Sequence, residues 1–187
     1  MKTRDISYAA MFTAVMAVAS VFSRFFPTPG GVPFSLQPLV VFLTGGLLNK
    51  RTAALSMTAY VALGLIGIPV FTSAPFGGLG YIMSPTFGFL LGFILAAWLI
   101  ALTMERIGRT LPGYLVACGL GLIVIYLVGL PYLYVILNFY LGKAVGVAAV
   151  MKIGLVPFIG FDLIKAGVAA ILGYAVRARI YPVGDTA

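Results

Sequence analysis

Residues 86–104 read TFGFLLGFILAAWLIALTM and carry no charged side chain. A helix of this length rises about 28 Å, close to the ~30 Å hydrocarbon core of a lipid bilayer. The stretch ends at charged residues in the segment MERIGRT, residues 104–110. It therefore predicts a membrane-spanning helix, and this prediction sets the fold class of the whole chain.

The composition supports the same fold class. The chain has 187 residues, of which 62% are hydrophobic and 9% are charged, against about a quarter charged in soluble domains. This excludes a soluble enzyme, a disordered chain and a nucleic-acid-binding domain. The net charge of +8 arises from basic residues that stand singly or in pairs between apolar segments. We therefore expect membrane lipid and no nucleic acid as a partner, and a single membrane domain over residues 1–187.

Further apolar segments flank the first one on both sides. They cover residues 6–23, 38–48, 52–68, 111–141 and 157–177. The segment 111–141 is too long for one crossing, so Pro131 is expected to kink or end its helix. Residues 143–153 are expected to form an outer loop or an interfacial helix. The sequence thus predicts an all-α integral membrane protein, a bundle of six transmembrane helices with Gly/Pro-rich outer loops.

The positions of the basic residues predict the topology. Six crossings place both termini on one side of the membrane, and that side carries eight of the twelve basic residues. The other side carries Arg24, Lys143 and Lys152, while Lys165 lies inside the last span. Because basic residues are enriched in cytoplasmic loops, both termini are predicted to be cytoplasmic.

One acidic residue stands apart from the other three. Asp162 lies near the outer end of the last span, and Lys165 follows three residues later, on the same helical face. The pair could merely orient its helix, or it could meet a ligand. Intramembrane charges usually mark a functional site, which favours the second interpretation. A carboxylate accepts and an ammonium donates hydrogen bonds, so the pair suits a small ring with adjacent N–H and C=O groups, such as a ureido ring.

Two loops without a charged residue are rich in glycine and proline. They are FPTPGGVPFSLQP at 26–38 and IPVFTSAPFGGLGYIMSP at 68–85. Irregular backbone near membrane depth occurs where it lines a cavity or is covered by protein. The candidate pocket residues in these loops are Phe34, Gln37, Phe71, Thr72, Ser73, Tyr81 and Ser84. The alternative, that the loops only connect helices, stays open.

Small residues mark one face of the first span. Ala10 and Ala14 form an A-x-x-x-A motif, and Thr13 and Ala17 extend it. Small residues four positions apart let another helix approach closely. This face is expected to dock onto a helix of the same chain or of a partner.

Five segments in order resemble one family. They are YAAMFTAVMAV (8–18), VPFSLQP (32–38), GIPVF (67–71), GGLGYIMSPTFGFLLGF (77–93) and PFIGFDLIKA (157–166). The chain resembles the BioY family, the biotin-specific S components of energy-coupling-factor (ECF) vitamin transporters. The resemblance implies six helices, a biotin pocket near the outer surface and a first loop (27–38) that closes over it. It also implies a bacterial or archaeal cell membrane, and partners comprising a transmembrane coupling subunit and two ABC-type ATPases, which alone would use ATP.

The resemblance also assigns roles to residues. It implies that Asp162 and Lys165 contact the ureido ring, and that Ala10 and Ala14 face the coupling subunit. Phe161 departs from the small residue expected before the aspartate. Arg24 is a candidate for binding the carboxylate of biotin by its position alone.

Other functions receive less support. A membrane enzyme would need a nucleophile, a base or a metal site, and the chain has no histidine and no paired acids for that role. It has no Walker A motif, and no ring of charges or repeated filter sequence that would indicate a channel. No enzymatic activity and no cofactor are therefore expected. An S component for another vitamin stays an alternative.

Overall fold

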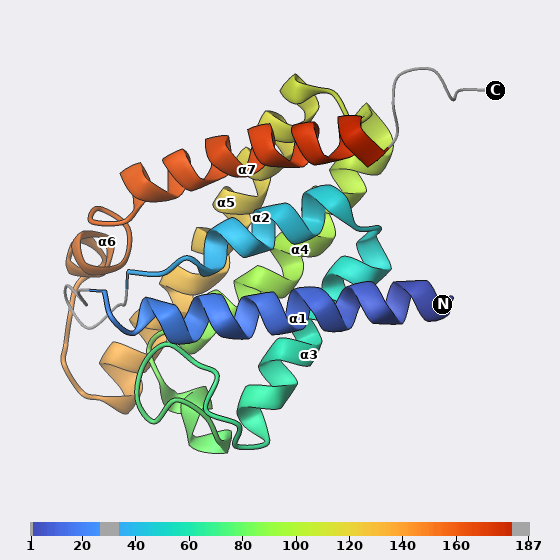
Figure 1. The fold of residues 1–187 in the computed structure, drawn as a ribbon. Helices are drawn as coiled ribbons and strands as arrows, with labels where there is room; N and C mark the ends of the chain where they lie inside the picture. Colours follow the sequence, from blue (N-terminus) through green and yellow to red (C-terminus); the bar gives the residue numbers. More distant parts are fainter. Residues whose placement is uncertain (1, 27–33, 181–187) are drawn as a thin grey trace.

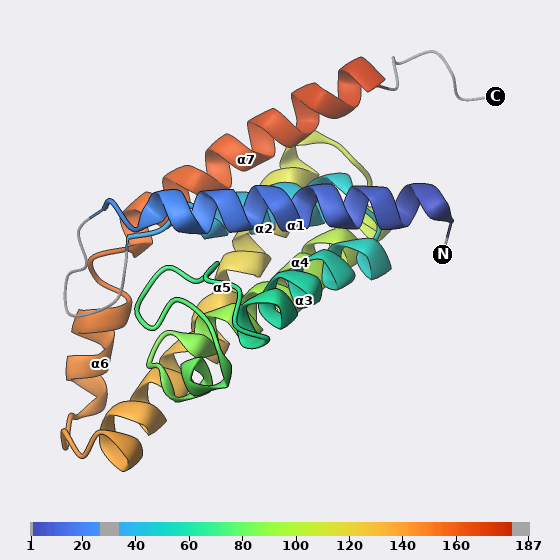
Figure 2. The same cartoon turned by 60° about the horizontal axis from the view of Figure 1, so that its bottom comes forward.

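The computed structural model describes residues 2–26 and 34–180, and these residues form helices joined by loops, without a strand among them. The helices are α1 (Thr3–Ser23), α2 (Gln37–Leu47), α3 (Lys50–Leu65), η2 (Leu79–Met83), α4 (Phe87–Ile107), α5 (Leu111–Val135), η3 (Ile136–Tyr140), α6 (Val147–Gly154) and α7 (Ile159–Ile180). The long helices form a bundle, shown from two sides in Figures 1 and 2. The predicted all-α fold is confirmed.

Four of the described helices are long and apolar enough to cross a membrane. They are α1, α4, the continuous Leu111–Tyr140 segment and Ile159–Arg179 of α7. With 11 and 16 residues, α2 and α3 rise about 16 and 24 Å, less than the ~30 Å hydrocarbon core. By length, the structure therefore has four candidate spans where the sequence predicted six.

The helix after residue 111 does not end at its internal proline. Pro131 lies inside α5, which continues to Val135 and then into the π-helix η3. Membrane helices tolerate such breaks where neighbouring groups satisfy the backbone. Beyond the proline, in η3, Asn138 Nδ2 donates to the carbonyls of Tyr134 and Val145, each at 3.0 Å. The predicted region 143–153 contains the helix α6, so its helical alternative is confirmed.

Small residues allow the central helices to pack closely. A Cβ added to Gly92 of α4 would lie 3.0 Å from the carbonyl oxygen of Ile125 in α5. One added to Gly45 of α2 would lie 2.6 Å from the Cβ of Ile100 in α4. Since lipid tails are as apolar as the side chains, such close van der Waals contact is a main source of helix association in a membrane. The buried α2 is therefore held in the bundle despite its shortness.

The two ends of the bundle differ. The start of α1, the turn between α2 and α3, and the end of α7 lie at one end, which we call the terminal end (Figure 1). At this end Asn49 caps α3 by accepting from Thr52 N at 3.0 Å, and Lys50 pairs with Glu105 at 2.8 Å. The loop before η2 and helix α6 lie at the opposite end (Figures 1 and 2). Most of the predicted closing loop, residues 27–33, lies outside the described residues.

Candidate functional site

A mostly apolar cavity of about 60 Å³ lies where the start of α2, α4, α5 and α7 meet. Its lining residues are Ser35, Gln37, Pro38, Thr72, Tyr81, Thr86, Phe89, Leu90, Phe93, Ile125, Tyr126, Gly154, Phe158, Asp162 and Lys165. At ~30 Å³ of liquid volume per water, a space of this size holds about two water molecules. A few polar groups on apolar walls are typical of a small-molecule site.

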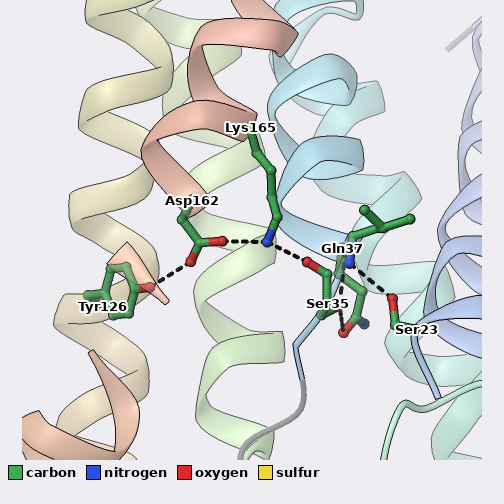
Figure 3. A network of polar contacts seen from close by, with 7 residues as sticks. Ser23, Ser35, Gln37, Tyr126, Asp162 and Lys165 are labelled. Carbon is green, nitrogen blue, oxygen red and sulfur yellow. Dashed lines mark hydrogen bonds and ion pairs between the residues drawn. The ribbon is translucent and has the colours of Figure 1, made fainter. Parts of the chain in front are cut away.

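The carboxylate of Asp162 is the centre of the polar side of this cavity. Asp162 lies in the first turn of α7 and is 5% exposed. Its Oδ1 accepts from Lys165 Nζ at 2.7 Å, and its Oδ2 accepts from the Tyr126 hydroxyl at 2.6 Å (Figure 3). The positive end of the α7 dipole also favours negative charge here. Two hydrogen bonds thus fix the carboxylate, and the helix dipole stabilises its charge. Each oxygen keeps a lone pair for another donor.

Lys165 connects α7 to the segment that precedes α2. Its Nζ donates to the backbone carbonyl of Ser35 at 2.6 Å and lies 5.0 Å from the ring centre of Phe34 (Figure 3). An ammonium has three N–H donors, and two are used by Asp162 and Ser35. One N–H is left for a ligand that enters the cavity.

The next polar group along the cavity wall is the amide of Gln37. Its Oε1 accepts from Ser35 Oγ at 2.8 Å and from Thr72 Oγ1 at 2.7 Å. Its Nε2 donates to the Tyr60 hydroxyl at 2.9 Å. These bonds join the start of α2 to α3 and to the loop before η2. The predicted loop residues therefore form a connected wall, as expected for backbone that lines a cavity.

Tyr81 occupies the far side of the cavity. Its hydroxyl lies 2.9 Å from Ser73 Oγ and 3.0 Å from Thr86 Oγ1. Its ring lies against that of Phe71, with 4.2 Å between the ring centres. Ser84 Oγ is 3.0 Å from Thr86 Oγ1, which places Ser84 behind a lining residue. The hydroxyls of Ser73 and Thr86 thus fix the orientation of the Tyr81 ring.

The structure brings together most of the residues predicted from sequence. Asp162, Lys165, Gln37, Thr72 and Tyr81 line the cavity, whereas Ser73, Phe34, Phe71 and Ser84 do not. The last three support lining residues: Phe71 and Ser84 as described above, and Phe34 by packing on Phe158 with 5.8 Å between ring centres.

Sequence reasoning missed several lining residues. They are Ser35, Pro38, Thr86, Tyr126 and Phe158, together with Phe89, Leu90 and Phe93 of α4, Ile125 of α5 and Gly154 of α6. Tyr126 is the most consequential, because its hydroxyl contacts Asp162. Its position inside an apolar run gave no signal, since a tyrosine there can equally face lipid.

Phe161 and Arg24, which the sequence also singled out, lie outside the cavity lining. Phe161 is 54% exposed and packs edge-on against Phe34 with 4.6 Å between ring centres, so Asp162 still faces the cavity. Arg24 lies outside the cavity lining and donates to the carbonyls of Phe71, at 3.1 Å, and Pro69.

The polar groups of this site are placed to form hydrogen bonds with a molecule in the cavity. Over the residues that the structure describes, no three His, Cys, Asp or Glu side chains gather to hold a metal ion. The site instead offers a fixed carboxylate, an ammonium and an amide within apolar walls. Such a set binds a neutral ring that carries both donors and acceptors.

The chain is similar to proteins of one family. The model of the BioY family matches residues 1–181. A probable biotin transporter BioY of Lysinibacillus sphaericus is 40% identical over 97% of this chain and 88% of its own length. The biotin transporter BioY of Thermotoga maritima is 37% identical over 93% of this chain and 96% of its own.

The fold agrees with this likeness. A crystal structure of the S-component for biotin from an ECF-type ABC transporter superposes with a TM-score of 0.76 and 25% identity, over 95% of this chain and 94% of that chain. Both the sequence and the fold thus match over nearly the full length, and the chain belongs to the BioY family.

Proposed function

We propose that this chain is the biotin-binding membrane subunit of an ECF-type, ATP-driven vitamin uptake transporter. The observation that carries the proposal is the buried Asp162–Lys165 pair at a cavity in a member of the BioY family. The relatives are named as biotin transporters, which speaks against a membrane enzyme.

We infer that Asp162 and Lys165 recognise the ureido ring of biotin. A ureido group has N–H donors beside one carbonyl acceptor. Asp162 has lone pairs left to accept a ureido N–H, and Lys165 has one N–H left to donate to the carbonyl. Both contacts are charge-assisted, and therefore stronger than bonds between neutral groups. We assign Gln37 and Tyr81 to the cavity wall around the rest of the ligand, with Phe34, Phe71 and Ser84 supporting them.

Binding requires the cavity to enlarge. Its volume of about 60 Å³ is well below the ~300–1,000 Å³ of typical ligand pockets. Ser35 belongs to the most adaptable part of the wall, because residues 34–36 are non-helical. This segment is attached by the Lys165–Ser35 bond and by a hydrogen bond from Leu36 N to Ser23 Oγ at 2.9 Å. We infer that this segment moves outward when biotin enters, in line with the closing loop expected over 27–38.

The proposed partner-docking face is on α1. An apolar groove of about 530 Å³ runs between α1 and α3, and Ala10 and Ala14 line it together with Ala17, Ala59 and Ala62. Such a groove of small residues accepts a helix at close range. We propose that the transmembrane coupling subunit docks here, and that two ABC-type ATPases complete the transporter.

We further propose that the chain is one membrane domain with six crossings and cytoplasmic termini, in a bacterial or archaeal cell membrane. The short helices α2 and α3 would complete their crossings with the irregular segments 34–36 and 66–86. The common position of the start of α1 and the end of α7 supports this topology (Figure 1).

Binding of radiolabelled biotin to the purified chain tests the proposed function. We expect saturable binding at a single site, displaced by excess unlabelled biotin but not by a vitamin without a ureido ring. Lys152→Met is the matched control for Lys165→Met, because Lys152 is exposed and lies outside the cavity. Absence of saturable biotin binding, together with saturable binding of another radiolabelled vitamin, would assign the chain to a different substrate.

A further inference from the structure

Four buried polar side chains close a cycle of hydrogen bonds beside the proposed biotin cavity. They are Ser20 of α1, Gln37 at the start of α2, Tyr60 of α3 and Thr72 in the loop before η2, and we call them the cyclic network. Gln37 and Thr72 line the cavity, whereas Ser20 and Tyr60 lie behind them. The function proposed above assigns no role to Ser20 or Tyr60.

The donors and acceptors of the cyclic network match one another. Gln37 Nε2 donates to the Tyr60 hydroxyl at 2.9 Å, and the single proton of this hydroxyl is shared by Ser20 Oγ at 2.9 Å and the Val70 carbonyl at 3.0 Å. Thr72 Oγ1 donates to Gln37 Oε1 at 2.7 Å and lies 3.1 Å from Ser20 Oγ. Because the Thr72 proton is already used, Ser20 donates to Thr72, and the cycle closes.

This arrangement fixes the orientation of the Gln37 amide. The Val70 carbonyl can only accept, so the Tyr60 proton is directed away from Gln37, and the amide must meet Tyr60 with its nitrogen. The amide oxygen accepts instead from Thr72 and from Ser35 Oγ, the latter at 2.8 Å. An amide turned over would place its oxygen against the Tyr60 oxygen with no proton between them. One orientation of this cavity-lining side chain is therefore favoured.

The cyclic network also connects α1 to the cavity wall. The structure describes every residue of α1, and none of them lines the cavity. Ser20 nevertheless contacts the lining residue Thr72 and the α3 residue Tyr60. Because a hydrogen bond tolerates only a narrow range of distances and angles, these two contacts fix the height and rotation of the last turns of α1. The position of α1 and that of the Thr72 hydroxyl therefore depend on each other.

A fixed wall makes ligand binding less costly. Without the cyclic network, Gln37 and Thr72 would have other rotamers to lose when a ligand enters, and this loss of freedom weakens binding. The segment 34–36 is the wall that we infer to move, and Gln37 follows it directly in the sequence. The bonds to Tyr60 and Thr72 hold the Gln37 amide from the opposite side. The moving part of the wall thus ends at a side chain that stays in place.

We propose that Ser20 and Tyr60 are positioning residues for biotin binding, which act by holding Gln37 and Thr72 in the orientation that the ligand meets. This inference rests on the proposed function. The helix α1, on which we place the partner-docking face, then contributes to biotin affinity without touching the ligand. By linkage, a displacement of the last turns of α1 changes biotin affinity, and bound biotin stabilises one position of α1.

A second hydrogen bond between α1 and α3 supplies the matched control. Thr13 Oγ1 donates to the Ser56 carbonyl at 3.0 Å, about two helical turns before Ser20. Both residues are buried, and neither lines the cavity. Thr13→Val and Ser20→Ala each remove one buried hydroxyl that joins the same two helices. If the cyclic network only attached α1 to the bundle, both variants would affect biotin binding equally.

Biotin titration and thermal unfolding of the full chain in detergent test the proposal. We expect Ser20→Ala and Tyr60→Phe each to raise the Kd for biotin about three- to tenfold, the effect of one buried hydrogen bond. Thr13→Val should lower the unfolding temperature to a similar degree but leave the Kd unchanged. Tyr60→Phe retains the aromatic packing on Phe71, with 5.7 Å between ring centres. In a Gln37→Leu background, Tyr60→Phe should not raise the Kd further, because a positioning residue acts through its partner.

Three outcomes would each overturn the proposal: an unchanged Kd in both Ser20→Ala and Tyr60→Phe, an equal rise of the Kd in Thr13→Val, or a further rise when Tyr60→Phe is added to Gln37→Leu. Should Tyr60→Phe fail to fold, the comparison of Ser20→Ala with Thr13→Val decides. Failure of the proposed function gives a different result, since the unaltered chain would then bind no biotin.

Discussion

The Asp162–Lys165 pair permits a test that separates ligand recognition from a structural role. Both side chains are buried, with 7% and 12% of their side-chain surfaces exposed. Removing one partner leaves the other as a lone buried charge, which costs about 3–5 kcal/mol of stability. A structural pair therefore predicts that Asp162→Asn and Lys165→Met each destabilise the fold, and that the double variant recovers most of the loss.

Ligand recognition predicts a different pattern for biotin affinity. Each single variant loses one charge-assisted hydrogen bond to the ureido ring, about 1.5–3 kcal/mol, or roughly ten- to a hundredfold in Kd. The double variant loses both bonds, so its affinity should not recover even where its stability does. The recovery of stability without recovery of affinity is the expected outcome.

The assay combines two measurements on each of the four proteins. Biotin titration gives the Kd, and thermal unfolding without biotin gives the stability. Lys50→Met and Glu105→Gln are the control cycle, because this pair is partly exposed at the other end of the bundle and surface pairs contribute only about 0–1 kcal/mol. A double Asp162/Lys165 variant that binds biotin with nearly unaltered affinity would refute ureido recognition by the pair, and the site would then have to be sought around Gln37 and Tyr81.

Three other predictions concern the Tyr126 hydroxyl, the proposed docking face and the membrane topology. Tyr126→Phe removes the bond to Asp162 Oδ2 and should weaken biotin binding about tenfold, while Tyr134→Phe should not; equal titration curves would contradict a positioning role. Ala10→Trp and Ala14→Trp should abolish co-purification with the coupling subunit but not biotin binding, whereas Val18→Trp, 70% exposed and outside the groove, should preserve both; normal co-purification of the alanine variants would place the docking face elsewhere. In a Cys118→Ala background, Lys50→Cys should be labelled by an impermeant thiol reagent in inside-out vesicles only, and labelling in intact cells would reverse the proposed topology.

The sequence predicted the long helices well because their signal is local. A run without charge, such as residues 86–104, is long enough to reach across a bilayer, and α4 spans Phe87–Ile107. The shortness of α2 was also visible, since its apolar run has only 11 residues. The continuation of α5 past Pro131 was not visible, because whether a proline ends a helix or only interrupts its hydrogen bonds depends on how the surrounding structure satisfies the backbone.

The residues of the candidate site also divide into those with a local signal in the sequence and those whose role depends on tertiary contacts. Asp162 and Lys165 were found because a charge in an apolar segment is costly and therefore informative. Gln37 and Tyr81 were found because their Gly/Pro-rich segments could not form one continuous helix, although Gln37 begins α2 and Tyr81 lies in the short helix η2. Tyr126 was missed, since its role depends on the approach of α7 to α5, a tertiary contact that no spacing in the sequence encodes.

The contacts of Lys165 connect recognition to opening of the cavity. Its ammonium holds both Asp162 and the Ser35 carbonyl, so the residue that we assign to the ligand also holds the wall that must move. A ureido carbonyl that accepts from Lys165 competes with Ser35 for the same three N–H donors whenever the geometry does not allow all three bonds. Ligand entry and release of the segment 34–36 are then opposite sides of one exchange of hydrogen bonds. Because Leu36 N is bonded to Ser23 at the end of α1, movement of this segment also reaches the helix that carries Ala10 and Ala14, which provides a physical route from the biotin cavity to the proposed docking face.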